Sequence, residues 1–91
     1  QLYSKQEEKL EVAALEYTDM ASKLGSSLEI IGPVNANVYK ISDYYRKLTY
    51  IKHNDYDILL KVKEEIELLI KTNEDTGLRI FDEIGIMYDI V

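Results

Sequence analysis

Few side chains in this sequence are suited to catalysis or to metal binding. His53 is the only histidine among the 91 residues, and there is no cysteine. One chain therefore cannot supply a multi-histidine or Cys-His metal site, because such zinc sites need three or four ligands. A Ser-His-Asp triad would have to use His53, which the hydrophobic pattern places in an exposed turn. No serine lies in a glycine-rich nucleophile elbow.

Two short motifs around residue 75 resemble functional sites but lack the required context. Asp75-Thr76-Gly77 is the tripeptide of aspartic proteases, which set a pair of such carboxylates on facing β-loops. Here the tripeptide lies between helical patterns. Asn73-x-Asp75-x-Gly77 resembles the start of a calcium loop, but its glycine stands at the fifth position and Ile84 replaces the glutamate of the twelfth.

The remaining carboxylates fit a solvated helix surface. Glu64, Glu65 and Glu67 lack the Glu-x-x-His pattern of carboxylate-bridged metal pairs. No glycine-rich phosphate loop is present. We therefore predict a protein that is not an enzyme and that binds no metal, no cofactor and no small-molecule substrate, with carboxylate-only chemistry as the alternative.

Tyrosine is the unusual feature of the composition. Eight residues are Tyr, whereas Phe occurs once and Trp is absent. Tyrosine beside Arg and Lys is typical of interfaces, because the ring buries area while the hydroxyl finds a polar partner. The same mixture can stack bases and hold phosphates of a single strand, and tyrosines at the wet edge of a small core are the third interpretation. The predicted partner-binding residues are Tyr39, Lys40, Tyr44, Arg46, Lys47 and Tyr50.

Charge is distributed unevenly along the chain. The net charge is −6, which argues against a general nucleic-acid binder. Residues 34–53 nevertheless carry four basic side chains against one acidic, whereas the rest of the chain carries seven basic and sixteen acidic. Neighbouring helices that complement each other are the commonest cause of such asymmetry.

The predicted partner-binding residues must be positioned by helices, because apolar side chains recur every three or four residues along the chain. The longest such stripe predicts a helix over residues 5–31, opened by Ser4 and Glu7 as a capping box. Such a helix would be about 40 Å long, and a second chain or the remaining residues must cover it. The stripe residues that we assign to the core or to self-association are Leu10, Tyr17, Leu24, Leu28 and Ile31.

Three further helices are predicted over residues 34–52, 56–72 and 78–90. Gly32-Pro33 separates the first two, because proline ends or opens helices, and Asn54 or Asp55 can cap the third. No strand-like alternation or hairpin signal is apparent. The predicted fold is therefore all-α, a single domain over residues 1–91 that forms a small antiparallel, coiled-coil-like bundle of three to four helices, completed in one version by dimerisation.

Three functional hypotheses follow. The first is a protein-protein interaction module or assembly subunit that buries apolar helix faces against itself or a larger partner. The second is a small acidic inhibitor or immunity-type protein that masks a basic partner. The third is a nucleic-acid adaptor that uses the basic, Tyr-rich residues 34–52. The longest apolar run is four residues, Val12–Leu15, so we expect no membrane span and a cytoplasmic location.

Overall fold

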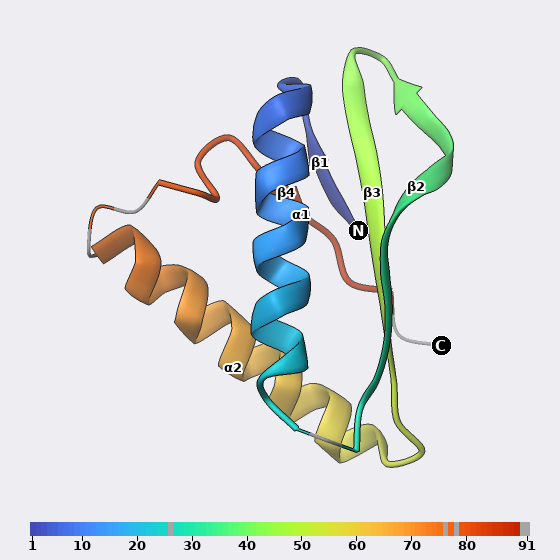
Figure 1. The fold of residues 1–91 in the computed structure, drawn as a ribbon, viewed down its shortest axis with the longest axis vertical. Coiled ribbons are helices and arrows are strands. Elements are labelled where there is room, and N and C mark those ends of the chain that lie inside the picture. The colour runs from blue at the N-terminus through green and yellow to red at the C-terminus, as the bar shows by residue number, and fades with distance from the viewer. Residues whose placement is uncertain (26, 76, 78, 90–91) are drawn as a thin grey trace.

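Figure 1 shows the computed structural model, which describes residues 1–25, 27–75, 77 and 79–89. The strands form one antiparallel sheet in the order β2-β3-β1-β4. This is the split βαβ arrangement, in which β3 lies between the two strands of the first β-α-β unit. The elements are β1 (Leu2–Ser4), α1 (Glu7–Ser22), β2 (Glu29–Ile41), β3 (Tyr44–Lys52), α2 (Tyr56–Asp75) and β4 (Gly85–Ile86).

The prediction of an all-α, coiled-coil-like bundle is wrong, because the chain has an α+β fold with two helices and a four-stranded sheet. The helix predicted over 34–52 is instead the hairpin of β2 and β3. The helix predicted over 5–31 ends at Ser22, and β2 begins at Glu29. The segment predicted as helix 78–90 contains β4 and turns, while residues 78 and 90 lie outside the described residues. The prediction over 56–72 corresponds to α2.

One face of the helix α1 packs across the sheet. Its buried residues recur at helical spacing, and several of them are alanines that let the helix backbone approach the strands closely. The capping box does not form, because Ser4 lies in β1 and its Oγ accepts from the Gln6 amide at 3.0 Å. The buried residues of α1 are Leu10, Ala13, Ala14, Tyr17, Met20 and Ala21.

The hairpin of β2 and β3 turns at two residues with positive φ, Ser42 (50°) and Asp43 (69°). Positive φ at both central positions matches the twist of the flanking strands, as in a type I′ turn. Along β3, alternate side chains face opposite sides of the sheet. Tyr45 and Ile51 pack against the core, and Thr49 Oγ1 lies 2.9 Å from Oγ1 of Thr18 in α1.

Gly32 and Pro33 do not separate two helices but lie inside β2, where the pairing with β3 shifts between Ile31 and Val34. Gly32 has a φ of +125°. A Cβ atom on Gly32 would lie 2.8 Å from the backbone oxygen of Leu48. Glycine is therefore required here both by the backbone conformation and by the close approach of β3.

The helix α2 runs diagonally to α1 in Figure 1 and buries only Val62 and Ile66 completely. Its first turn is capped by Asp55, whose Oδ1 accepts from the Asp57 amide at 2.9 Å. Neither helix of the described part of the chain is long and apolar enough to cross a membrane. The core lies between α1, one flank of α2 and the inner face of the sheet.

We predict that Gly32→Ala lowers the free energy of unfolding by about 1–3 kcal/mol, because the new Cβ meets the Leu48 carbonyl and the positive φ disfavours an L side chain. Thermal unfolding followed by circular dichroism measures the change. Gly25→Ala is the matched control, because its nearest contact would be at an ordinary 3.9 Å. Equal melting temperatures for Gly32→Ala and the parent chain would contradict this account of β2.

Candidate interaction surface

One face of the sheet is covered by neither helix. The side chains on this face follow from the strand pairing, because residues directly opposite each other in antiparallel strands share a face. Ile31 faces Tyr50, Val34 faces Leu48 and Ile41 faces Tyr44. We call this surface the open face, and its residues are Tyr3, Glu29, Ile31, Val34, Ile41, Tyr44, Arg46, Leu48, Tyr50, Lys52 and Met87.

The open face is strongly apolar and well exposed. Tyr50 is 47% exposed, Ile41 45% and Ile31 40%, although each lies in a regular strand of a small domain. Strand residues that face a covered side of the same sheet, such as Tyr45 and Ile51, pack against the core instead. The open face therefore carries apolar area that the chain itself does not bury.

The six predicted partner-binding residues divide between the two faces of the sheet. Tyr44, Arg46 and Tyr50 lie on the open face. Tyr39, Lys40 and Lys47 lie on the helix-covered side, so the prediction groups residues that the structure separates.

Lys47 is held inside the molecule. It is 8% exposed, and its Nζ lies 2.9 Å from Oε1 of Glu11 in α1. Tyr39 donates a long hydrogen bond of 3.4 Å to the same carboxylate oxygen. The Nζ of Lys40 lies 5.2 Å from the ring centre of Tyr45. These contacts attach the β2-β3 hairpin to α1 and leave Lys47 unavailable to a partner.

The residues assigned to the core or to self-association also differ in their environments. Leu10 and Tyr17 are buried in α1. Leu24 and Leu28 follow the end of α1 and are partly buried against the core cluster. Ile31 is on the open face in β2, so only this residue of the predicted stripe offers area to a partner.

Aromatic and basic side chains meet on the open face near β1. The rings of Tyr3 and Tyr44 are arranged edge to face, with centres 5.7 Å apart. The Nζ of Lys5 lies 5.3 Å from the centre of the Tyr44 ring. The Tyr3 ring lies over Gly85 of β4, where a Cβ would meet the ring directly. This packing keeps the two tyrosines rigid, which lowers the entropy that binding would otherwise cost.

Arg46 organises the same region of the open face. Its Nη1 donates to the Val38 carbonyl at 3.1 Å, and its Nη2 donates to Oε1 of Gln1 at 2.9 Å. The guanidinium is thereby fixed between β2 and β1 while its charge stays beside the exposed side chains. A shallow hollow with Ile41, Tyr44 and Met87 in its lining adjoins it.

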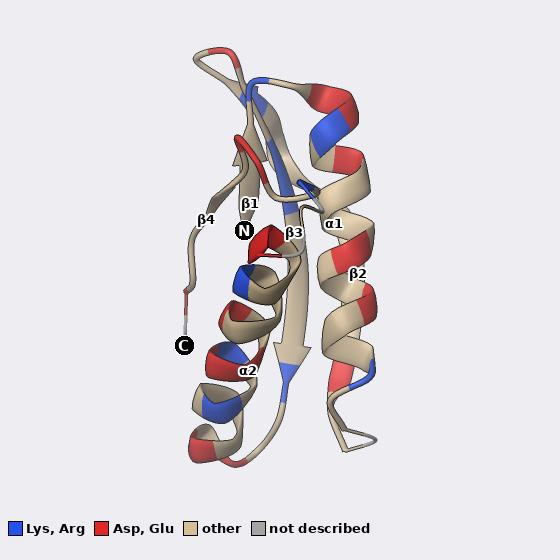
Figure 2. Cartoon of the chain, turned by 90° about the vertical axis from the view of Figure 1, so that its left-hand side faces the viewer, with Lys and Arg blue, Asp and Glu red and all other residues tan. Residues whose placement is uncertain are grey.

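Charge is separated between the layers, as Figure 2 shows. The helix α1 carries five acidic residues and one basic, and α2 carries six acidic and three basic. Residues 29–52 carry four basic side chains and two acidic. The negative charge of the protein therefore lies on the helices, and the sheet is the basic layer.

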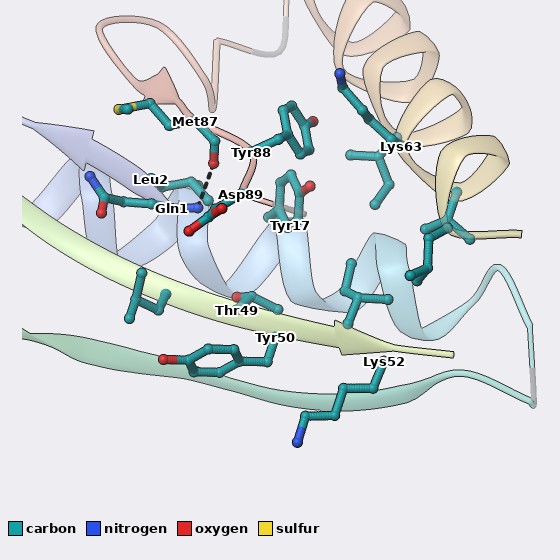
Figure 3. A pocket seen from close by; sticks show the side chains of 15 residues that line it. Gln1, Leu2, Tyr17, Thr49, Tyr50, Lys52, Lys63, Met87, Tyr88 and Asp89 are labelled. Carbon is teal, nitrogen blue, oxygen red and sulfur yellow. Dashed lines mark hydrogen bonds between the residues drawn. The ribbon is translucent and has the colours of Figure 1, made fainter. Parts of the chain in front are cut away.

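A groove of about 500 Å³ lies between the last residues of β3, the flank of α2 and the segment Met87–Asp89, and Figure 3 shows its lining. Tyr17 and Tyr88 lie side by side in the groove. Burial is the largest cause that raises the pKa of both phenols. The Tyr88 hydroxyl is buried but makes no hydrogen bond of good geometry with the described residues. The Nζ of Lys63 lies 4.7 Å from the centre of the Tyr88 ring.

No protein-family model, curated protein or solved structure matches this chain.

The described ranges contain no cluster of metal-binding side chains. No group of three or more His, Cys, Asp or Glu side chains there could hold a metal ion. His53 lies in the turn before α2, where its Nδ1 accepts from the Asp55 amide at 2.9 Å. The motif Asp75-Thr76-Gly77 begins at the last residue of α2, and Thr76 lies outside the described residues.

Sequence reasoning missed several open-face residues, notably Tyr3, Val34, Ile41 and Met87. A signal for the hairpin was present, because residues 34–51 are rich in the β-branched and aromatic types that favour strands. Over residues 47–50 the alternation is inverted, because the polar Lys47 and Thr49 face the helices while the apolar Leu48 and Tyr50 face away from them.

We predict that Tyr39 loses its proton near pH 12. Desolvation, the largest cause, and the negative charges of Glu7 and Glu11 together raise the pKa of Tyr39 from 10.0 to about 12. The absorbance of the parent chain and of Tyr39→Phe is titrated at alkaline pH. The difference between the two curves reports the ionisation of the Tyr39 phenol. A difference curve centred at pH 10.0 would contradict the prediction.

The raised pKa of Tyr39 also affects the free energy of unfolding. The unfolded chain loses the Tyr39 proton at a lower pH than the folded chain does. The raised pKa therefore stabilises the fold fully below pH 10, and this stabilisation is lost as the pH rises toward 12. The fall in unfolding free energy over this range should therefore be smaller for Tyr39→Phe.

Proposed function

We propose that this chain is a non-enzymatic interaction module that docks on a partner protein through the open face. The observation that carries the proposal is the row of apolar side chains on two paired strands that neither helix covers. Ile31, Ile41 and Tyr50 are each at least 40% exposed on this face. Contiguous exposed apolar area with a polar rim is typical of protein-protein interfaces, and rigid aromatic anchors add to affinity.

The charges around the open face favour a partner with an apolar surface and carboxylates at its rim. Lys5, Arg46 and Lys52 contribute positive charge, against Glu29 opposite Lys52 and Asp43 in the hairpin turn. Complementary charge speeds association and fixes orientation. An Arg46 guanidinium already fixed by two hydrogen bonds would meet such a carboxylate with little loss of side-chain entropy.

A second copy of this chain fits the open face less well. A two-fold dimer through this face would bring together two copies of the same patch, in which basic side chains outnumber acidic ones. Like charges at an interface weaken association. The acidic helices also supply charge for the masking of a basic partner, which is the competing hypothesis.

A pair of double variants tests the docking proposal. Ile31→Ser with Ile41→Ser removes apolar area from the open face, whereas Val12→Ser with Leu15→Ser removes apolar side chains that are even more exposed from α1. We expect the open-face variant to retain about a tenth or less of any partner protein that the parent chain binds. A tenfold loss of affinity corresponds to about 1.4 kcal/mol of binding free energy. Quantitative affinity purification measures retention, and circular dichroism checks that each variant folds.

Two results would overturn the proposal. Equal retention by the open-face variant would show that the partner uses another surface. Self-association of the parent chain in sedimentation, abolished by the same variant, would assign the open face to a second copy.

Single-stranded nucleic acid is the second candidate, favoured by the tyrosines on the two central strands. Tyr3 lies on β1, and Tyr44 and Tyr50 lie on β3, all on the open face. Aromatic side chains on the central strands of a four-stranded antiparallel sheet can stack successive bases. Lys5 and Lys52 would contact phosphates, and the acidic helices lie on the far side of the sheet.

Binding of a labelled oligothymidylate of about 12 nucleotides at low salt tests this candidate. If bases stack on the open face, Tyr44→Ala weakens the binding measured by fluorescence anisotropy by about tenfold, and Leu15→Ala on α1 leaves it unchanged. Absence of binding by the parent chain at low salt would eliminate the candidate.

A further inference from the structure

The described part of the chain is two layers thick, a sheet and the helices on one side of it. Its Cα trace measures 16 Å along the shortest axis, which one sheet and one layer of helices fill. On the opposite side, the open face carries three apolar pairs across β2 and β3. These pairs are Ile31 with Tyr50, Val34 with Leu48 and Ile41 with Tyr44.

The apolar area of the open face has the dimensions of one helix. From Tyr44 to Tyr50, β3 advances about 20 Å at roughly 3.3 Å per residue, which is the length of about 13 helical residues. The area is two strands wide, and neighbouring strands lie about 4.8 Å apart. A helix of about 10 Å diameter therefore covers both rows of side chains.

The main chain of the sheet limits what can lie on the open face. The amide and carbonyl groups of β2 and β3 point within the sheet, toward neighbouring strands, so a partner meets side chains only. A single extended segment laid across the face would leave its own main-chain groups against Ile31 and Val34 without hydrogen bonds, which is unfavourable. A helix satisfies its main-chain groups internally and can bury an apolar stripe there.

The two ends of the open face differ in charge. At the hairpin end, Lys5 and Arg46 stand against Asp43, whereas at the other end Lys52 lies opposite Glu29. The carboxyl end of a helix carries partial negative charge on its free carbonyl groups. The hairpin end therefore suits the carboxyl end of a docked helix, with an acidic side chain of its last turns beside the Arg46 guanidinium.

We propose that the open face binds an amphipathic helix of a partner protein, laid along β2 and β3 with its carboxyl end beside Arg46. Apolar side chains three and four residues apart in this helix pack on the rows that run from Tyr44 to Tyr50. The docked helix covers the second face of the sheet, as in domains with helices on both faces. This inference rests on the proposed function, because it names the kind of partner that the open face takes.

The probes are two blocked, fluorescent peptides of about 18 residues with the same composition, long enough to span the face when helical. In the first, leucines recur every three or four residues and two glutamates lie near the carboxyl end. In the second, leucines stand at every second residue, so they share one face only when the peptide is extended. Anisotropy at low salt measures binding to the unmodified protein. We expect the first peptide to bind at least about tenfold more tightly than the second.

A third peptide tests the orientation of the helix. It carries the two glutamates in its first turn, which favours the free helix because negative charge suits that end of the helix dipole. We nevertheless expect it to bind about threefold more weakly than the first peptide, because the glutamates then lie far from Arg46. Equal binding of these two peptides would overturn the orientation.

Variants of the protein locate the bound helix. Ile31→Ser with Ile41→Ser should weaken binding of the first peptide by about tenfold, whereas Val12→Ser with Leu15→Ser on α1 should leave it unchanged. Equal loss in both double variants would place the helix elsewhere and overturn the inference.

The inference and the docking proposal can fail separately. Absence of binding by the first peptide, or equal or tighter binding of the alternating peptide, would overturn the helical occupant. Loss of partner retention by Ile31→Ser with Ile41→Ser would then still support docking on the open face. Equal retention by that variant refutes the docking proposal even where the helical peptide binds.

Discussion

The packing of α1 against one side of the sheet is the interaction on which the rest of the structure depends. Its stripe from Leu10 to Ala21 is buried against the inner side chains of the strands and α2. The ion pair of Glu11 with Lys47 and the hydroxyl contact of Thr18 with Thr49 fix the position of α1 along β3. A sheet has two faces, and one helix on one face with a second at its flank leaves the other face in water.

The open face follows from that arrangement, because it is the side of β2 and β3 that α1 cannot reach. The groove lies between the last residues of β3, the flank of α2 and Met87–Asp89. Within the described residues, no group of three or more His, Cys, Asp or Glu side chains could hold a metal ion. The apolar area exposed on the open face is the observation that supports the proposed binding role.

Some segments of the fold could be predicted from the sequence and others could not, and the reasons are physical. Residues 56–72 and the first part of residues 5–31 have a helical period and are helices. Leu28 and Ile31 continue that period by coincidence, since β2 begins at Glu29. In β3 the inner side carries Lys47 and Thr49, whose polar groups are satisfied by α1, while Leu48 and Tyr50 face outward. The alternation is therefore the reverse of the usual apolar inner and polar outer side.

The candidate site was only partly predictable for the same reason. Counting tyrosine and basic residues found Tyr44, Arg46 and Tyr50, which share the open face. It could not separate them from Tyr39, Lys40 and Lys47, because the face of each side chain depends on strand pairing and on a bulge between Asn35 and Lys40. The groove depends on contacts between residues far apart in the chain, such as Gln1 with Met87, which no local pattern records.

Hydroxyl-radical footprinting of the dilute protein tests most directly whether one face of the sheet is uncovered. Tyr44 and Tyr50 should be oxidised at rates close to that of Tyr56, which is exposed on α2, whereas Tyr17 in the core should be strongly protected. Protection of Tyr44 and Tyr50 equal to that of Tyr17 would contradict the account, because it would show that the chain itself covers both faces of its sheet.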